Sequence, residues 1–380
     1  MATRKRADKF PLWWHTGAKA WAKKIRGRFY YFGPDRDAAL IDYAEVLDAL
    51  KAGREPRRKA GALTLVELVN SFLTAKRERV DSGELTAAMW GEYFHMSERI
   101  LTTIGRERVV VDLRPEDFGR LRKAATEKLG PVALTKFITM ARTLFGYAFK
   151  AELIDVPVRF GDRFDKPPKR VLRLERAVNG PKLIAAADLW TLIDAADVQL
   201  RAMLYLGLNC GFGQADCAAL QWRDLERRAG WVDFPRVKSG VARRAPLWPE
   251  TITALAAVHP IRPEPKDPAD AGCVFITVQG NRWCCYRDPG NGKRGHSLDA
   301  VARAFRRLCT STGVKVPGGP YVMRHIFRTI ADETKDRPAI DLIMGHADHT
   351  QASYYREQIG DDRLEAVVNH VRNWLLVARK

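Results

Sequence analysis

Apolar residues recur at intervals of three and four along residues 63–152, a pattern typical of amphipathic helices. The stripes are Leu65, Leu68, Val69, Phe72 and Leu73, then Trp90, Phe94 and Leu101, then Phe137, Ala141, Leu144, Phe145 and Ala148. Thr64, with Glu67 three residues later, predicts a capping box at the start of the first helix, and Pro115 favours another helix start. We therefore expect a domain of four or five helices over residues 63–152, with the stripes forming its core.

The first 60 residues follow a different pattern. Residues 21–26 and 28–32 are short runs rich in aromatic and basic residues on either side of Gly27, which predicts two short strands joined by a turn. Residues 37–50 show helical spacing of apolar positions. We expect residues 1–60 to form a small domain, a two-stranded ribbon backed by a helix, that ends in a charged linker.

Beyond residue 152 the pattern changes twice. Residues 153–182 carry Pro-containing breaks and many cations but no sustained periodicity, so we expect an extended, basic interdomain linker. Residues 183–380 mix helical and strand patterns and predict a mixed, mostly helical domain. Within it, the longest uncharged stretch, 202–215, has 14 residues, fewer than the roughly 20 of a membrane span, and predicts buried core. The expected fold is multidomain and mainly α, with α+β parts.

The net charge of the chain indicates which class of partner it binds. The sequence holds 64 Lys and Arg against 45 Asp and Glu, a formal net charge of +19. Such an excess favours a polyanion, and we expect double-stranded DNA. The cations expected to contact its backbone are Lys23, Lys24, Arg26 and Arg28 on the ribbon and Lys169 and Arg170 in the linker. A basic ribbon fits a DNA groove, although a solvated charged hairpin would show the same pattern.

Several classes of protein are excluded by what the sequence does not contain. It has no Gly-rich cofactor loop, no Walker loop and no HExxH motif. Two histidines, His346 and His349, are too few ligands to form a metal site. We therefore expect no cofactor and no metal. A basic start without a following apolar region and 6 cysteines without a CxxC pair predict a cytoplasmic, nucleoid-associated protein with reduced thiols and no membrane contact.

Candidate chemistry lies toward the C-terminus. Lys238 is expected at the tip of a hairpin, followed in the chain by Arg324, His346 and Tyr355. A tyrosine hydroxyl can attack a phosphodiester, an arginine can stabilise the charge that develops on the phosphate, and a lysine can protonate the departing 5′ oxygen. A histidine can hydrogen-bond the phosphate or relay a proton. This set suits phosphoryl transfer on a nucleic acid backbone.

The spacing of these residues resembles that of the tyrosine recombinase or phage integrase family. Tyr321-x-x-Arg324-His325 is similar to the family's HxxRH box, with Tyr321 in place of the first histidine. Gly345-His346 followed nine residues later by Tyr355 resembles the family's spacing between the Gly-His pair and the nucleophile.

The resemblance extends over nearly the whole chain. Lys238 is similar to the β-hairpin lysine of the family, and residues 206–222 resemble its first motif. Residues 1–60 look like the arm-site domain of some integrases, residues 63–152 like the helical, SAM-like core-binding domain, and residues 183–380 like the tyrosine recombinase catalytic domain.

The resemblance implies a site-specific DNA recombinase that acts as a homo-oligomer, a tetramer on DNA, without ATP or metal. It implies that Tyr355, rather than Tyr354, forms a 3′-phosphotyrosyl bond. Arg324 would hold the scissile phosphate, Lys238 would be the general acid, His346 would support the phosphate, and the phenol of Tyr321 would donate a hydrogen bond.

One position departs from the family. Three residues before Asp216, where the first motif has an arginine, this chain has Gly213. Gln214 is adjacent, and Arg243 or Arg244, which we also expect to contact DNA, could reach in from the hairpin; the sequence leaves the substitute open. Two alternatives to the recombinase therefore stand: a catalytically impaired DNA-binding protein on the same scaffold and a type IB topoisomerase-like strand transferase.

Overall fold

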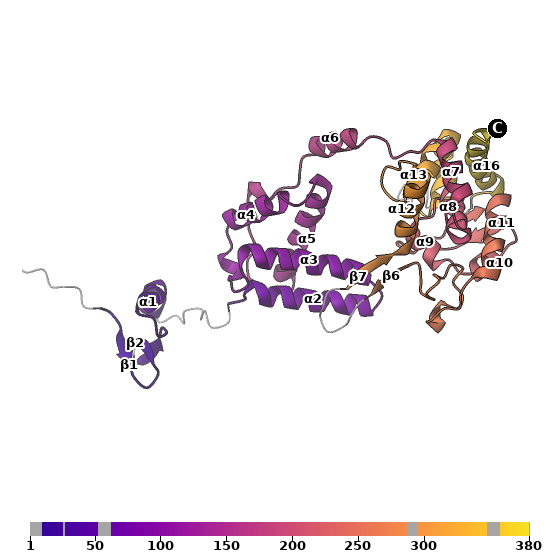
Figure 1. The fold of residues 1–380 in the computed structure, drawn as a ribbon. Coiled ribbons are helices and arrows are strands. Elements are labelled where there is room, and N and C mark those ends of the chain that lie inside the picture. The colour runs from indigo at the N-terminus through magenta and orange to yellow at the C-terminus, as the bar shows by residue number, and fades with distance from the viewer. Residues whose placement is uncertain (1–9, 26, 52–61, 288–294, 348–357, 380) are drawn as a thin grey trace, which may run out of the picture. The chain divides into compact units, whose positions relative to one another are not determined.

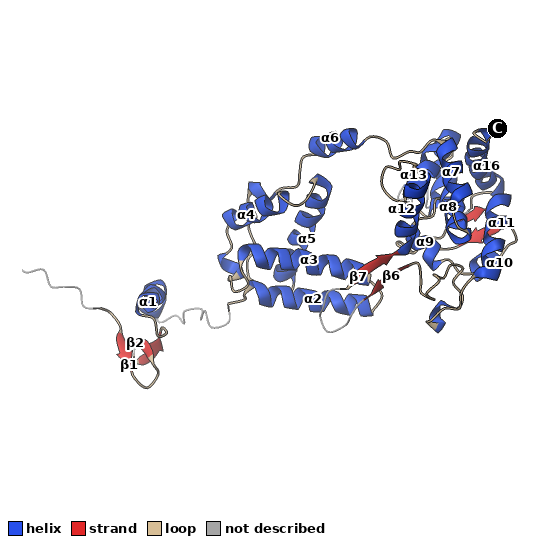
Figure 2. Ribbon diagram, in the orientation of Figure 1, coloured by secondary structure: helices blue, strands red, loops and turns tan. Residues whose placement is uncertain are grey.

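The computed structural model describes residues 10–25, 27–51, 62–287, 295–347 and 358–379 (Figure 1). Helices predominate and strands are few and short (Figure 2). The chain separates into two compact units, Met1–Phe72 with Ile100–Arg122 and Arg142–Phe164, and Leu73–Arg99 with Lys123–Ala141 and Asp165–Lys380.

The N-terminal residues form a three-stranded antiparallel sheet with one helix. The elements are β1 (Trp13–His15), β2 (Ala20–Ile25), β3 (Arg28–Tyr31) and α1 (Arg36–Lys51), and the strand order is β1-β2-β3. Leu12, Ala39 and Tyr43 form a small core of their own. The predicted two strands, turn and helix are confirmed. The third strand was not predicted, because Trp13–His15 is too short to show an alternating pattern.

The predicted helical segment is confirmed as four α-helices with a short 3₁₀ turn. They are α2 (Leu65–Asp81), α3 (Ala87–Ile104), η1 (Val110–Asp112), α4 (Pro115–Thr126) and α5 (Pro131–Lys150), followed by η2 (Asp162–Phe164). The capping box is present, since the Thr64 N–H donates to Glu67 Oε2 at 2.8 Å and the Glu67 N–H to Thr64 Oγ1 at 3.3 Å. Phe118, Phe145 and Phe164 pack edge to face or tilted in the first unit.

The linker expectation for residues 153–182 is wrong in part. Residues Lys169–Asn179 form the helix α6, which begins directly after Pro168 and ends at Gly180. Val171, Leu174 and Val178 do lie at helical spacing, but this short stripe is exposed and no residue of α6 is buried. Lys, Arg, Leu and Glu nevertheless have good intrinsic helix propensity, which explains the helix.

The C-terminal part of the second unit is mixed and mostly helical, as predicted. Its elements are α7 (Ala186–Ala195), α8 (Val198–Cys210), α9 (Gln214–Ala219), α10 (Arg223–Glu226), β4 (Trp231–Asp233), β5 (Arg244–Pro246), α11 (Pro249–Val258), η3 (His259–Ile261), η4 (Pro268–Asp270), β6 (Cys284–Arg287), β7 (His296–Asp299), α12 (Ala300–Thr312), α13 (Val322–Ala331), η5 (Asp332–Thr334), α14 (Arg337–Met344) and α16 (Asp361–Val377). Strands β4 and β5 pair antiparallel, as do β6 and β7.

Helix α8 is the centre of this core. All but two of its residues are buried. This confirms the prediction of buried core for residues 202–210, the part of the uncharged stretch that lies in α8. The last helix, α16, packs on the same core: the indole N–H of Trp248 donates to the Val368 carbonyl and that of Trp190 to the Leu375 carbonyl, each at 2.9 Å.

All six cysteines lie in the described residues, and none forms a disulfide there. Among the residues that the structure describes, no helix combines the length and apolar character needed to cross a membrane.

Candidate active site

Arg324 occupies the centre of the candidate site, on helix α13, with only 3% of its surface exposed. Its guanidinium donates to the Gly211 carbonyl and, at 2.8 Å, to the Met344 carbonyl. These carbonyls lie at the C-terminal ends of α8 and α14, where each helix ends at a glycine with φ of +63°. Helix ends leave carbonyls without partners inside the helix, so they suit a buried cation.

His346 links Arg324 to an acidic residue. Its Nε2 lies 2.8 Å from Arg324 Nη2, and its Nδ1 lies 3.2 Å from Asp341 Oδ1. Burial and the Arg324 charge lower the pKa of His346, and the Asp341 carboxylate opposes this effect. The geometry fits a neutral imidazole that accepts from Arg324 at Nε2 and donates to Asp341 from Nδ1.

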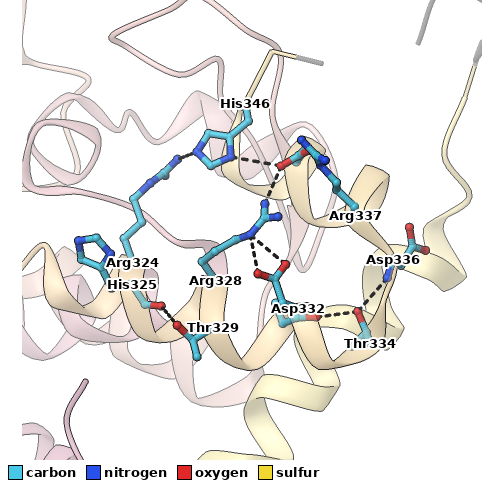
Figure 3. A network of polar contacts seen from close by, with 11 residues as sticks. Arg324, His325, Arg328, Thr329, Asp332, Thr334, Asp336, Arg337 and His346 are labelled. Atoms are coloured by element: carbon cyan, nitrogen blue, oxygen red, sulfur yellow. Dashed lines mark hydrogen bonds and ion pairs between the residues drawn. The ribbon is translucent and has the colours of Figure 1, made fainter. Parts of the chain in front are cut away.

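Asp341 is held in turn by Arg328, whose Nη1 donates to Asp341 Oδ1 at 2.7 Å. Figure 3 shows the side chain of Arg324 reaching the ring of His346, and Arg328 in contact with Asp332. Asp341 and Arg328 were not predicted from the sequence; the signal that could have indicated Arg328 is its spacing of four residues from Arg324 on one helix face. The network fixes the ring of His346 beside Arg324.

The backbone around Gly213 is closely surrounded. The Gly213 N–H donates to Asp216 Oδ2 at 2.9 Å, which places Asp216 at the start of α9. A Cβ at position 213 would lie 3.1 Å from the ring of Tyr321. Tyr321 immediately precedes α13, is 42% exposed and packs edge to face on His325. Tyr321 therefore lies over the position where the family motif has its arginine.

Arg243 lies behind Asp216 and is fully buried, with 0% of its surface exposed. Its Nη2 lies 3.3 Å from Asp216 Oδ1, its Nε donates to the Phe234 carbonyl at 3.1 Å, and its guanidinium lies 3.8 Å from the centre of the Phe212 ring. Burial lowers the pKa of Arg243, and the charge of Asp216 counteracts this. A cation enclosed in this way offers no surface to a DNA backbone, which corrects that expectation for Arg243.

Arg244 points to the other side, because neighbouring residues of a strand face opposite ways. It forms an ion pair with Asp361 at the start of α16, and Arg228 pairs with the same carboxylate. Arg244 is thus engaged away from Asp216 and does not replace the missing arginine; its contact with DNA stays a prediction.

Lys238 lies exposed in the turn between β4 and β5, as predicted from the hairpin pattern. In the same hairpin, the Arg236 N–H donates to the Val241 carbonyl at 2.9 Å. The side chain of Arg236 lies against Gly345, the residue before His346, with its Cδ 3.4 Å from the position of a Cβ there. The sequence analysis did not identify Arg236, since a single cation in a hairpin carries no pattern.

The remaining predicted residues lie elsewhere. Lys23 is half-buried and donates from Nζ to the Pro11 carbonyl at 2.6 Å, whereas Lys24 is exposed with its Nζ 5.2 Å from the centre of the Phe29 ring. Arg28 begins β3, and Lys169 and Arg170 are exposed at the start of α6. Arg26 and the predicted nucleophile Tyr355, with its neighbour Tyr354, lie outside the described residues.

The described residues offer no metal site: no group of three or more His, Cys, Asp or Glu side chains among them could hold an ion. The cations of the described part instead form a group that suits anion binding. Arg324, Arg236 and the imidazole of His346 gather at one place, and an exposed lysine lies on the same hairpin as Arg236.

Residues 178–359 match the model of the phage integrase family. A lambda integrase dimer bound to a COC′ core site matches with a TM-score of 0.55 and 14% identity, over 94% of this chain and 97% of that chain. A lambda integrase tetramer bound to a Holliday junction matches with a TM-score of 0.55 and 13% identity, over 93% and 99%.

The Tn1549 transposon integrase in complex with circular intermediate DNA matches with a TM-score of 0.55 and 17% identity, over 80% of this chain and 98% of that chain. At these identities the solved structures establish the fold. No curated protein matches the chain.

Proposed function

Residues 178–359 belong to the phage integrase family, and from this membership we propose that the chain is a site-specific DNA recombinase that cuts and rejoins DNA through a 3′-phosphotyrosyl intermediate. The observation that carries the proposal is the position of Arg324, buried between two helix ends and hydrogen-bonded to His346. A guanidinium fixed in this way is preorganised for the charge that develops on a phosphate.

The proposed roles follow from the chemistry of each group. Tyr355 attacks the scissile phosphate, and a 3′-phosphotyrosyl bond forms as the bond to the 5′ oxygen breaks. Lys238, exposed on the hairpin, gives its proton to that 5′ oxygen. Arg324 binds a non-bridging oxygen, while His346 and Tyr321 lie close enough to Arg324 and Gly213 to contribute further hydrogen bonds.

The proposal needs neither ATP nor metal, because the energy of the broken phosphodiester is kept in the tyrosyl ester until the strands rejoin. The solved integrases of similar fold include a dimer and a tetramer on DNA. We propose the same kind of assembly on double-stranded DNA for this chain, with its +19 charge favouring the encounter.

A trapping experiment tests the proposal. The full-length chain is incubated with a duplex selected from a random-sequence library and nicked so that the short 5′ product diffuses away. We expect a covalent protein–DNA adduct that resists denaturation and is lost in Tyr355→Phe. Binding without an adduct would favour the DNA-binding alternative, for which Gly213 is the specific observation.

Relaxation of a supercoiled plasmid distinguishes the third candidate, a type IB topoisomerase-like strand transferase, from a recombinase. A topoisomerase-like enzyme relaxes any supercoiled plasmid and recombines none. We expect this chain to join two selected sites in trans, because the recombinase proposal requires two duplexes to exchange strands.

A further inference from the structure

Among the described residues that belong to the family motif, Arg324 alone offers a guanidinium to a phosphate, whereas the family motif provides two. Gly213 has no side chain, and Tyr321 lies over it. Arg243 is enclosed by Phe212 and Asp216, and Arg244 is paired with Asp361. Neither of the two cations that the sequence offered as a replacement can therefore reach a phosphate held by Arg324.

Unlike Arg243 and Arg244, Arg236 lies beside the candidate site. Its backbone is fixed inside the hairpin, because its N–H donates to the Val241 carbonyl at 2.9 Å and its carbonyl accepts from the Gly240 N–H at 2.8 Å. The stem of its side chain lies against Gly345, where a Cβ would approach Arg236 Cβ to 2.8 Å. Gly345 has a φ of +63° and precedes His346, so the arginine stem is packed directly beside the candidate site.

The charges around Arg236 point to an anion. Burial, and next the charge of Arg236, lower the pKa of Arg324 to about 10, and Arg236 also helps to lower the pKa of His346. Within the described ranges, no acidic side chain lies within ion-pair distance of the half-buried Arg236. Two guanidinium groups close together without such a partner repel each other, and a bound phosphate would relieve that repulsion.

We propose that Arg236 is a catalytic residue whose guanidinium binds the scissile phosphate in place of the arginine that Gly213 lacks. This inference rests on the proposed recombinase function. It assigns the second cation of the site to the hairpin that also carries Lys238, so one element brings both the phosphate ligand and the general acid. An arginine suits this role because its planar fork can contact two phosphate oxygens at once.

The test compares three variants of the full-length chain on the selected, nicked duplex. Arg236→Ala should lower the rate of adduct formation by about 10²- to 10³-fold, the usual effect of removing one preorganised donor. Arg236→Lys should fall between it and the wild type, since it keeps the charge and loses the fork. The matched control is Arg227→Ala, because Arg227 is a surface arginine, 55% exposed and 3.8 Å from Asp233, and its loss should leave the rate unchanged.

Binding provides a second readout that needs no cleavage. The slope of log affinity against log salt should become shallower by about 0.9 in Arg236→Ala, and remain unchanged in Arg236→Lys and Arg227→Ala, if one phosphate contact is lost. Thermal melts of each variant exclude unfolding as the cause. A merely structural role for Arg236 would change the melt and leave the slope as it is.

The outcomes separate the two proposals. An active wild type with Arg236→Ala within about threefold of its rate would overturn the role of Arg236 and leave the recombinase standing. If the wild type forms no adduct, the recombinase proposal fails. The slope then still decides: a shallower slope in Arg236→Ala supports the phosphate contact, and an unchanged slope refutes it.

Discussion

At the scale of residues, position 213 is not an empty place that waits for an arginine. The ring of Tyr321 lies over it, and the carboxylate of Asp216 accepts its N–H. Behind that carboxylate, the guanidinium of Arg243 lies against the Phe212 ring and faces Asp216. The space around Gly213 is therefore filled by Tyr321 and Asp216 rather than left open for an arginine side chain.

This arrangement determines the effect of Gly213→Arg. The backbone at 213 is extended, with φ of −98°, so any residue can adopt it, but the new side chain must displace Tyr321 and would lie near Arg324. We expect adduct formation to fall by about tenfold or more, because a predicted hydrogen-bond donor is displaced and a like charge is added. Single-turnover trapping, with Gly213→Ala as the control and a thermal melt of each, measures it. A tenfold rise would show instead that the pocket lacks one cation.

The pKa of His346 sets a second expectation. It is lowered in the folded chain, so the folded state binds fewer protons than the unfolded state, whose value is about 6.5. Stability contributed by the neutral ring is therefore complete above that value and declines as the pH falls through it.

Urea midpoints measured from about pH 7.5 to about pH 5 check this expectation. Wild type should lose stability over this range, and His346→Gln should lose less. His325 also has a lowered pKa, so some slope should remain in the variant. Identical slopes in the two proteins would contradict a neutral His346 in the fold.

Sequence reasoning found the residues that belong to a motif and missed those that act through packing. Arg324, His346 and Lys238 were predicted from their order and spacing, and the structure places Arg324 and His346 in contact. Arg243 was expected to contact DNA or to reach into the site, but nothing in its sequence neighbourhood shows that Phe212, Phe234 and Asp216 enclose it. Contacts between residues so far apart in the chain depend on the fold.

At the scale of elements, periodicity predicted the helices that bury a face and failed for the one that does not. Helices α2 to α5 carry apolar stripes that are buried, whereas the short stripe of α6 is exposed and the segment was taken for an extended linker. The hairpin of β4 and β5 was predicted from its turn. Nothing in the sequence of the hairpin indicated that the side chain of Arg236 lies against Gly345.

Helix α16 begins six residues after Tyr355, and its attachment to the core is accessible to a test. The buried Trp248 donates to the Val368 carbonyl at 2.9 Å, and Arg372 forms a two-pronged pair with Glu250. Trp248→Phe keeps an aromatic ring in the core and removes that hydrogen bond, and we expect the free energy of unfolding to fall by about 1 to 2 kcal/mol.

Urea denaturation measures that loss. Trp190→Phe removes the equivalent bond to Leu375 and serves as the matched variant. Unfolding midpoints equal to that of the wild type in both variants would show that these indoles do not stabilise the attachment of α16.

At the scale of the whole molecule, charge is concentrated in particular segments. Residues 1–60 hold 15 Lys and Arg against 7 Asp and Glu, and the described part of this segment has its own small core. It can therefore be removed without exposing the core of the second unit.

Deletion of residues 1–60 should flatten the dependence of DNA affinity on salt, because each phosphate contact contributes about 0.9 to the log–log slope. Binding of the selected core duplex should remain detectable. Titrations at several salt concentrations with the full-length and shortened chains provide the comparison. A slope that the deletion does not change would argue against an arm-site role for this segment.

The measurement that tests the central claim most directly is mass spectrometry of the trapped adduct after digestion of both protein and DNA. The account predicts a nucleotide remnant on Tyr355, nine residues after His346, and an unmodified Tyr354. A remnant on Tyr354, or on no tyrosine at all, would contradict the proposed phosphotyrosyl mechanism.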